Sequence, residues 1–142
     1  MTLINTHCPE NRTAIIWRDY CFFKYSDVEF FGQIDTDNRL NLTDGKYWNR
    51  SSSMSTATRL LSDLSQTAIQ SPKFFAIGST GSLSGELYAM AQCTRDLSAN
   101  SCSTCLGQAL TDLSNCCFGK EGVRVFCGSC NVRYETYNFL TN

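Results

Sequence analysis

Residues 93–130 read CTRDLSANSCSTCLGQALTDLSNCCFGKEGVRVFCGSC and carry seven of the chain's nine cysteines. Within this stretch, apolar side chains and cysteines recur at steps of three and four from Cys102 to Cys117. This spacing predicts an amphipathic α-helix with Ser101 capping its first turn. The cysteines share the apolar face of that helix, which is the face that packs on a core. A helix joined by disulfides to strands before and after it is therefore the predicted centre of the fold.

The composition is that of a small secreted domain. Nine cysteines among 142 residues are far more than cytosolic proteins usually carry, and they indicate a disulfide scaffold formed in an oxidising compartment. Three N-x-[ST] tripeptides, which begin at Asn11, Asn41 and Asn49, are candidate glycosylation sites. The formal net charge of −1, with no basic run, disfavours nucleic acid and a charged membrane surface as partners. No apolar stretch approaches the ~20 residues of a membrane span.

The sequence contains an internal repeat. Cys8 and Cys21 are 13 positions apart, as are Cys117 and Cys130, and the apolar positions around the two pairs match. Two cysteines and an apolar pattern at one shared offset are typical of a duplicated unit. The repeat and the composition together predict three parts: a C-terminal remnant of a first copy (residues 1–31), a linker rich in Gly, Asp, Asn and Thr (residues 32–46), and a near-complete second copy (residues 47–142).

The pattern of apolar and turn-forming residues predicts an α+β fold. Apolar residues at helical spacing from Met54 to Ala68 predict a first helix that ends before Ser71 and Pro72. Strands are predicted where β-branched and aromatic residues cluster, at 14–17, 21–25, 74–77, 86–92, 123–126 and 131–137. A turn region is predicted between the third and fourth strands, from residue 78 to residue 85. The expected architecture is an antiparallel sheet with helices on one face.

The last two predicted strands form a hairpin that carries a candidate functional pair. If the chain turns around Gly128 to Asn131, residues whose numbers sum to 259 face one another, and Arg124 is then opposite Glu135. A cross-strand ion pair of this kind contributes about 0.2–1 kcal/mol, which is a sufficient structural reason for it. The functional interpretation is that a guanidinium and a carboxylate offer hydrogen-bond donors and acceptors at the spacing of sugar hydroxyls.

The cysteine motifs resemble those of a known plant family. They comprise C-x8-C-x2-C from Cys93, the pair Cys116-Cys117, GVRV at 122–125 and SCNVRYETYNF at 129–139. They are similar to the ectodomains of cysteine-rich receptor-like kinases, the cysteine-rich repeat secretory proteins and the ginkbilobin-like stress-antifungal domains. The resemblance covers residues 47–140 almost entirely and the last third of the first copy. It implies two helices on an antiparallel sheet of about five strands, stapled by disulfides, secreted, and without catalytic activity or cofactor.

For ginkbilobin-like members the resemblance further implies mannose recognition by an Asn, an Arg and a Glu. The family's Arg, six residues before the last cysteine, falls on Arg124, and its Glu, five residues after that cysteine, falls on Glu135. The family's Asn follows an N-terminal cysteine that the second copy lacks; Asn41 lies near the corresponding place but outside the motif. In the first copy the two matched positions hold Ile15 and Ser26, so the remnant is not expected to bind sugar.

The resemblance also implies a disulfide framework. Two pairs carry over, namely Cys93–Cys102 and Cys105–Cys130. The family pairs the cysteine at the position of Cys117 with an N-terminal cysteine that the second copy lacks. Three cysteines are therefore left to find partners among themselves: Cys116, Cys117 and Cys127. Two cysteines of the remnant have lost the rest of their copy and either pair with each other, stay reduced or cross-link chains: Cys8 and Cys21.

Other uses of cysteine remain open from the spacing. Cys102-x2-Cys105 and Cys127-x2-Cys130 together match the paired CxxC signature of a tetrahedral zinc site, although Cys127 has no counterpart in the first copy. A CxxC at the start of a helix is also typical of redox catalysis, but the sequence does not show the βαβ pattern of thioredoxin-like folds around it. Nucleophilic catalysis is disfavoured because the one histidine, His7, lies in the remnant.

These observations favour a secreted, non-enzymatic recognition module of plant defence or stress signalling, and in the sharpest version a mannose-binding antifungal lectin. The expected partner is a mannose-type cell-wall glycan or another extracellular protein. A protein-binding or redox-sensing receptor ectodomain is the alternative within the same fold, and a structural zinc-binding module is the alternative from another class. The family implies the apoplast as the location. Residues 1–8 lack the basic and apolar regions of a signal peptide, and a fragment or a shortened gene product would explain that.

Overall fold

The computed structural model describes residues 6, 8–18, 21–35, 37–47, 51–82, 85–117 and 119–140. The chain divides into two compact units, residues 1–31 and residues 32–142. His7 and Asn49 lie outside the described residues. The expectations for that histidine, and for glycosylation at that asparagine, therefore stay predictions.

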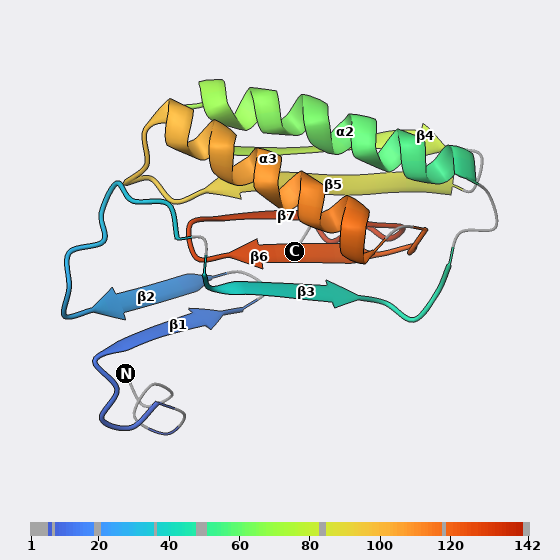
Figure 1. Cartoon of the computed structure of the whole chain (residues 1–142). Helices are drawn as coiled ribbons and strands as arrows, with labels where there is room; N and C mark the ends of the chain where they lie inside the picture. Colours follow the sequence, from blue (N-terminus) through green and yellow to red (C-terminus); the bar gives the residue numbers. More distant parts are fainter. Residues whose placement is uncertain are drawn as a thin grey trace. The chain divides into compact units, whose positions relative to one another are not determined.

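The first unit contains an antiparallel hairpin formed by β1 (Thr13–Trp17) and β2 (Phe22–Ser26) (Figure 1). An ion pair between Arg12 and Asp27 lies at the open end of this hairpin. Both strands fall where β-branched and aromatic residues predict them. Two aromatic side chains of β2 are exposed: Phe22 and Phe23.

The second unit is a five-stranded sheet with two helices. The strands are β3 (Arg39–Thr43), β4 (Phe75–Ser82), β5 (Gly85–Cys93), β6 (Val123–Cys127) and β7 (Cys130–Glu135). Their order in the sheet is β3-β6-β7-β5-β4, and each neighbouring pair is antiparallel. The helices α2 (Ser51–Gln70) and α3 (Ala99–Cys116) lie side by side on one face (Figure 1). The expected α+β class, with two helices on a five-stranded antiparallel sheet, is confirmed.

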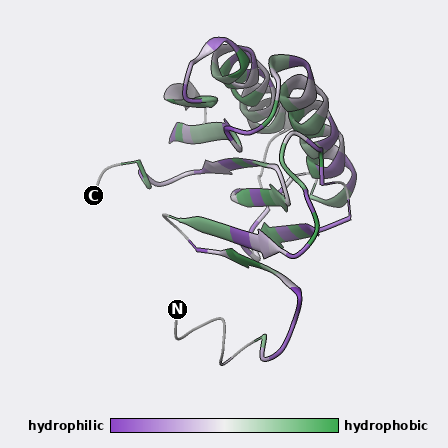
Figure 2. Cartoon of the chain, turned by 90° about the vertical axis from the view of Figure 1, so that its left-hand side faces the viewer, coloured by the Kyte–Doolittle hydropathy of each residue, from purple (hydrophilic) through white to green (hydrophobic). Residues whose placement is uncertain are grey.

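Alternation along the central strands gives the sheet one buried face. In β6 and β7 the side chains of Val123, Val125, Val132 and Tyr134 belong to the core beneath the helices and are at most 1% exposed. Burying side chains of this size stabilises the fold by roughly 1.5–3 kcal/mol each. The buried hydroxyl of Tyr134 donates a hydrogen bond to the carbonyl oxygen of Lys120 at 2.7 Å. Hydrophobic and hydrophilic residues form bands along both helices (Figure 2), as expected of helices with one face on a core.

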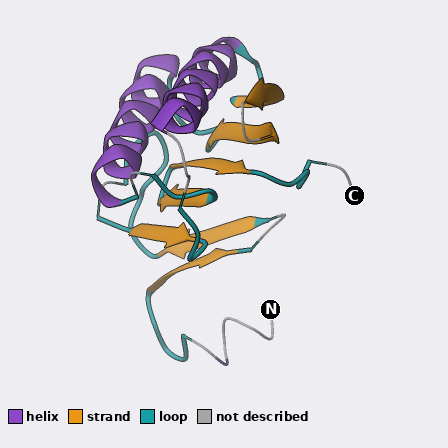
Figure 3. Ribbon diagram, turned by 90° about the vertical axis from the view of Figure 1, so that its right-hand side faces the viewer, coloured by secondary structure: helices purple, strands orange, loops and turns teal. Residues whose placement is uncertain are grey.

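Helix α2 approaches β4 closely because glycine stands at the contact. A Cβ atom at Gly78 would lie 3.2 Å from Cδ2 of Leu64, which is tighter than ordinary packing. Strand β4 runs through Gly78 and Gly81 to Ser82, so the turn region predicted from residue 78 to residue 85 is wrong over most of its length. Glycine in a sequence favours a turn, but here it serves the close packing of a helix on a strand. Figure 3 shows both helices on the same side of the sheet.

Helix α3 begins one turn earlier than the sequence predicts. Ser98 has extended backbone (φ −73°, ψ 161°) and is the N-cap, with its side chain accepting a hydrogen bond from the amide of Ser101. The expected cap, Ser101, is instead the third residue of the helix. The first turn holds no apolar residue that packs on the core. The apolar pattern therefore begins only at Cys102, one turn after the helix itself begins. The buried stripe lies where the period predicts it: Cys102, Cys105, Leu106, Ala109 and Leu113.

Strand β3 lies inside residues 32–46, which the composition predicts to be a linker. It pairs with β6 along its whole length, with Arg39 opposite Cys127 and Thr43 opposite Val123. All five of its residues are exposed, because an edge strand is paired on one side and its side chains meet few neighbours. The sequence RLNLT is only weakly strand-like. The linker prediction therefore missed this strand.

Candidate functional site

The side of the sheet opposite α2 and α3, which we call the outer face, holds the two expected binding residues of the last hairpin. Val125 in β6 and Val132 in β7 are buried beneath the helices. Their strand neighbours Arg124 and Arg133, which are paired with each other, therefore project from the outer face. Glu135 lies two residues beyond Arg133 on β7 and shares that face. The structure thus brings Arg124 and Glu135 to one side of the sheet.

The expected register of this hairpin is wrong. Arg124 does not face Glu135 but Arg133, so the numbers of facing residues sum to 257 instead of 259. The reason is a tighter reversal than expected, because β6 ends at Cys127 and β7 begins again at Cys130. A shift of this kind moves every cross-strand partner, and the predicted cross-strand ion pair is replaced by one along β7.

Glu135 forms its ion pair with Arg133. Nε of Arg133 donates to Oε1 of Glu135 at 2.9 Å, and the two side chains are only 12% and 13% exposed. Nη2 of Arg133 also donates to the Tyr137 hydroxyl at 2.7 Å, and its Cζ lies 4.1 Å from the ring centroid of Phe139. Aromatic rings after β7 thus contact Arg133 by hydrogen bonding and cation–π attraction. The alternation R-x-E-x-Y-x-F from residue 133 is the sequence signal for this arrangement.

Glu135 lies directly against the backbone of Gly122. A Cβ atom at Gly122 would overlap the Glu135 carboxylate, so the absence of a side chain there makes room for it. The amide of Gly122 donates to Oδ1 of Asp44 at 3.1 Å, which brings a second carboxylate near. Burial raises the pKa of Glu135; the hydrogen bond and charge of Arg133 oppose this rise, the Asp44 charge adds to it, and the Arg124 charge lowers the pKa.

Arg124 completes a compact set of charges. Its Cζ lies 4.1 Å from the ring centroid of Phe126, a cation–π contact that restricts the guanidinium. We call the four charged residues that act on one another here the arginine–carboxylate cluster: Asp44, Arg124, Arg133 and Glu135. Two guanidinium groups and two carboxylates offer fixed donors and acceptors for a polar ligand. Sequence reasoning missed the roles of Asp44, Gly122 and Arg133. The last two stand in quoted motifs, but the contacts of all three arise from packing.

Asn41 does not join this cluster. In the pairing of β3 with β6, Asn41 lies opposite Val125, whose side chain faces the helices. Asn41 is therefore on the helix side of the sheet edge, whereas Arg124 and Glu135 are on the outer face. The structure does not assemble the three expected sugar-binding residues. Asn11 and Asn41 are both exposed, and glycosylation at either stays a prediction.

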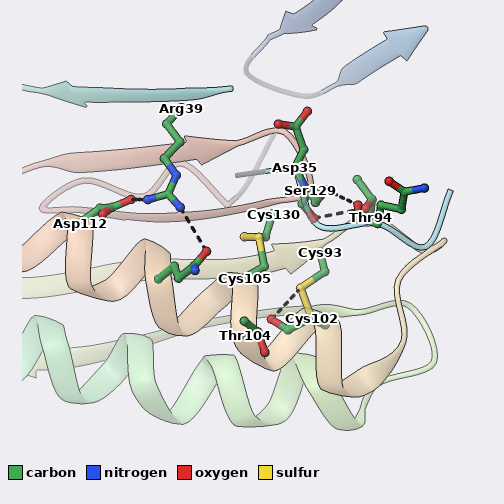
Figure 4. Close-up of a disulfide and its surroundings, with 12 residues drawn as sticks. Asp35, Arg39, Cys93, Thr94, Cys102, Thr104, Cys105, Asp112, Ser129 and Cys130 are labelled. Carbon is green, nitrogen blue, oxygen red and sulfur yellow. Dashed lines mark hydrogen bonds and ion pairs between the residues drawn. A yellow bond between two sulfur atoms is a disulfide. The ribbon is translucent and has the colours of Figure 1, made fainter. Parts of the chain in front are cut away.

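The described residues contain three disulfides. They are Cys93–Cys102, Cys105–Cys130 and Cys116–Cys117. The first joins the end of β5 to α3, and the second joins α3 to the start of β7 (Figure 4). These two are the pairs that the family resemblance implies. Together they tie the same helix to two neighbouring strands.

Cys127 differs from the expectation that it belongs to a disulfide. It carries a buried thiol outside the three bonds. The physical reason is that its two candidate partners, Cys116 and Cys117, are adjacent in sequence and are joined to each other. In the first unit, Cys8 and Cys21 also carry thiols, which is one of the outcomes left open by the sequence.

The sulfur chemistry does not fit the zinc alternative. A site built from both CxxC pairs requires four thiolates, but of the four cysteines only Cys127 is a thiol. Cys102 is bonded to Cys93, and Cys105 is bonded to Cys130. Because the two cysteines of the helical CxxC have different partners, they also do not form the internal disulfide of a CxxC redox catalyst.

Comparison with known proteins identifies the family. Residues 40–137 match the salt stress response/antifungal family, and the chain belongs to it. The resemblance read from the cysteine motifs is thereby confirmed. An antimicrobial ginkbilobin-2-like protein of Castanea crenata is 45% identical, over 96% of this chain and 58% of that protein. Cysteine-rich repeat secretory protein 38 of Arabidopsis thaliana is 42% identical, over 96% of this chain and 56% of that protein. The chain spans a little over half the length of these relatives.

Solved structures show the same fold. The tandem DUF26 ectodomain of the Arabidopsis thaliana cysteine-rich receptor-like protein PDLP8 has a TM-score of 0.82 and 25% identity, over 96% of this chain and 63% of that one. The corresponding ectodomain of PDLP5 has a TM-score of 0.71 at 23% identity, over 96% of this chain and 62% of that one. Similar proteins are thus named as secretory proteins or receptor ectodomains. In the described part of the chain, neither helix has the length and apolarity to cross a bilayer.

Proposed function

We propose that this chain acts outside the cell as a recognition module of plant defence, and that it binds a ligand without catalysing a reaction. Membership of the antifungal family, and relatives named as antimicrobial, secretory and ectodomain proteins, support the proposal. The observation that carries it is the arginine–carboxylate cluster, which holds charged side chains in place on one sheet face. Side chains fixed by packing and ion pairing are suited to recognition, because little conformational entropy is lost on binding.

The sulfur framework favours binding over catalysis. Among the described residues, one group of three or more His, Cys, Asp or Glu side chains has its potential metal-ligand atoms within mutual reach: Cys105, Cys127 and Cys130. Two of the three share a disulfide, and a disulfide sulfur is not a thiolate nucleophile. Because relatives are named as secretory and ectodomain proteins, we expect no release of reducing sugar from mannan beyond the rate without protein.

A mannose-type glycan is the ligand that we propose for the cluster. Arg124 offers donors to sugar hydroxyls, and the Glu135 carboxylate accepts from them with its second oxygen while Arg133 holds the first. Tyr137, which is exposed beside Arg133, adds aromatic surface of the kind that packs on sugar rings. Arg124 and Glu135 are the two positions at which the chain matches the family's sugar-binding residues.

Binding to immobilised mannan and to a mannose glycan array tests this ligand. Arg124→Ala should abolish most of the signal, because it removes the guanidinium without touching the core. The matched control is Asn41→Gln, on the other side of the sheet, which should bind as the unmodified chain does. Absence of a mannose signal from the unmodified chain rules out this ligand. Loss of binding in Asn41→Gln would show that the three-residue family site operates despite the placement of Asn41.

A second candidate is a protein partner on the same outer face. Four large apolar side chains of its two edge strands are exposed: Leu40, Leu42, Phe75 and Ile77. Their pairing partners on β5 and β6, such as Gln92 and Arg124, lie on the outer face, so all four project from that side. Leu40 and Leu42 lie at one edge of this face and Phe75 and Ile77 at the other, and exposed apolar side chains of this size favour protein association. The partner that fits is the sheet of another repeat of this family, because a solved relative is a tandem of such domains.

Sedimentation of the chain over a range of concentrations tests the second candidate. Self-association that Leu42→Ser weakens and Asn41→Gln leaves intact supports a sheet-to-sheet contact, since the two substitutions lie on adjacent residues but opposite faces. A chain that stays monomeric and binds mannose favours the glycan. The two measurements together separate the candidates.

A further inference from the structure

Three sulfur atoms lie together between α3 and the hairpin of β6 and β7. The Sγ atoms of Cys105, Cys127 and Cys130 are all within 4.8 Å of one another, and all three residues are buried. Cys105 and Cys130 are bonded to each other, whereas Cys127 carries a thiol. A thiol beside a disulfide is the arrangement that thiol–disulfide exchange requires.

The fold accounts for this arrangement. Cys127 ends β6 and Cys130 begins β7, so the two stand on either side of a tight turn. Cys127 stands two residues after Val125, and Cys130 stands two residues before Val132; both valines are buried beneath the helices. Residues two apart on a strand share a face, so both cysteines face the helices. On α3, Cys105 lies in the buried stripe that packs on this part of the sheet. The three sulfurs meet because one helix position faces both ends of one turn.

We propose that Cys127 exchanges with Cys130 for the bond to Cys105, so that α3 is tied to the sheet by either of two interchangeable disulfides. The inference does not depend on the ligand of the outer face. It assigns a role to Cys127, which has no counterpart in the first copy of the repeat and takes no part in the framework that the family resemblance implies.

The exchange is a balanced substitution at sulfur. Cys127 loses its proton to solvent, and the resulting thiolate attacks Sγ of Cys105. The bond between Cys105 and Cys127 forms as the bond between Cys105 and Cys130 breaks, and Cys130 leaves as a thiolate that takes up a proton. One disulfide and one thiol are present before and after, so the step needs no oxidant or reductant.

The two disulfides should stabilise the fold to a similar degree. The present bond spans 25 positions of sequence, and a bond from Cys105 to Cys127 would span three fewer. Because loop closure depends weakly on length, neither bond restricts the unfolded chain much more than the other. A bond between Cys127 and Cys130 would instead release α3 from the hairpin, so we assign the exchange to Cys105 as the sulfur that is attacked.

Charged groups from three segments surround the thiol. Burial raises the pKa of Cys127; Arg39 of β3 opposes this, while Asp112 of α3 and Asp35 before β3 add to it. Arg39 is held by Asp112 at 2.6 Å and by Gln108 at 3.1 Å (Figure 4). A raised pKa leaves little thiolate at neutral pH. The exchange should therefore be slow in acid and quicken as the pH rises.

Mass spectrometry of the non-reduced chain tests the proposal. The folded protein is held at mildly alkaline pH, quenched with acid, unfolded and alkylated, and each labelled cysteine is located by fragmentation of the peptides. We expect label at Cys130 as well as at Cys127, together with peptides joined through both Cys105–Cys130 and Cys105–Cys127. Cys8 and Cys21 take up label in either case. Among the three clustered cysteines, label at Cys127 alone overturns the proposal, and label at Cys105 overturns the assigned direction of attack.

Two variants make the test independent of the rate of exchange. In Cys127→Ser, Cys130 should stay unlabelled, because no thiol remains beside the disulfide; Cys8 and Cys21 keep their thiols in both chains. In Cys130→Ser, Cys105 should bond to Cys127; labelling of both in a folded variant contradicts the proposal. If Cys130→Ser does not fold, the labelling of the unmodified chain against Cys127→Ser decides alone.

Discussion

The buried carboxylate of Glu135 destabilises the folded chain when it is ionised. Burial raises its pKa in the folded chain above the unfolded value, despite the opposing pair with Arg133. A group with a raised pKa contributes its stability below the unfolded pKa and loses it as the pH rises through the folded pKa. Glu135→Gln removes this titration but keeps an oxygen that accepts the Arg133 hydrogen bond.

We therefore predict that the stability of Glu135→Gln, relative to the unmodified chain, rises as the pH is raised from acid to neutral. Urea unfolding at a series of pH values measures the difference in the free energy of unfolding. A difference that stays flat or falls over this range would contradict the pKa assignment. Arg133→Met, which removes the charge that lowers the pKa of Glu135, should raise the pKa of that carboxyl group further.

Gly128, in the turn between β6 and β7, is required by a neighbouring side chain. A Cβ atom there would overlap the side chain of Asp35, whose Oδ1 accepts from the amide of Asn38 at 3.1 Å and from its side chain at 3.0 Å. Gly128→Ala should therefore destabilise the fold by about 1–3 kcal/mol, the usual effect of overpacking. In an Asp35→Gly background, which also removes the Cβ atom that would overlap, the same substitution should have a much smaller effect, and a double-mutant cycle by thermal unfolding measures the coupling. Additive effects would show that the two residues do not collide.

The start of α3 offers a test at the scale of an element. Ser98 caps the helix, accepting from the amide of Ser101 at 3.0 Å, so Ser98→Ala should lower the free energy of unfolding by about 1 kcal/mol. Ser101→Ala is the matched control, because the sequence alone assigns the cap to that residue. Chemical unfolding of both variants measures the free energy of unfolding, and Ser101→Ala should lower it less than Ser98→Ala does. Equal effects, or a larger one at Ser101, would move the cap back to the expected position.

At the scale of elements, a strong periodic pattern of apolar residues predicted the elements that pack on the core. Where the pattern is weak, at an edge strand and a turn, the predictions were wrong. Helix α3 is predictable because Cys102 to Leu113 repeats at helical spacing over several turns. Strand β3 is not, because an edge strand with exposed residues has little apolar pattern. The hairpin register is set by the tight reversal after Cys127, which no apolar pattern determines.

The candidate site was predictable in part for the same reason. Arg124 and Glu135 stand in motifs of contiguous sequence, and the structure puts both on one face. Asp44 comes from a distant segment, and both Asp44 and Gly122 meet Glu135 through tertiary packing, which sequence spacing does not reveal. The face of the sheet on which Asn41 lies follows from the pairing of β3, which the sequence did not indicate.

The whole molecule should be separable at the boundary between its two units. Residues 32–142 contain the five-stranded sheet, both described helices and the three disulfides. We predict that a chain of residues 32–142 unfolds in one cooperative transition, as small domains do, near the melting temperature of the full chain. Circular dichroism during heating provides the measurement. A truncated chain without a cooperative transition would show that residues 1–31 are needed for folding, and would contradict the proposed division into a remnant and a second copy.

The disulfides should differ in their contribution to global stability. Replacing both Cys93 and Cys102 by serine removes a link between β5 and α3, and should lower the free energy of unfolding by about 2–5 kcal/mol. The matched control replaces Cys116 and Cys117, whose bond joins adjacent residues; it should have a much smaller effect, because such a bond closes hardly any loop. Guanidinium unfolding without reductant compares the two. A larger loss in the control would contradict the stapling of α3 as a source of stability.

The central claim is that the outer face of the sheet recognises the ligand. The most direct measurement is a nuclear magnetic resonance titration of the isotope-labelled chain with a mannose oligosaccharide. We predict shifts concentrated at the amides of Gly122, Arg124, Arg133 and Glu135, with little change along α2 and α3. Shifts confined to the helices or to Asn41, or the absence of any shift at saturating sugar, would contradict the claim.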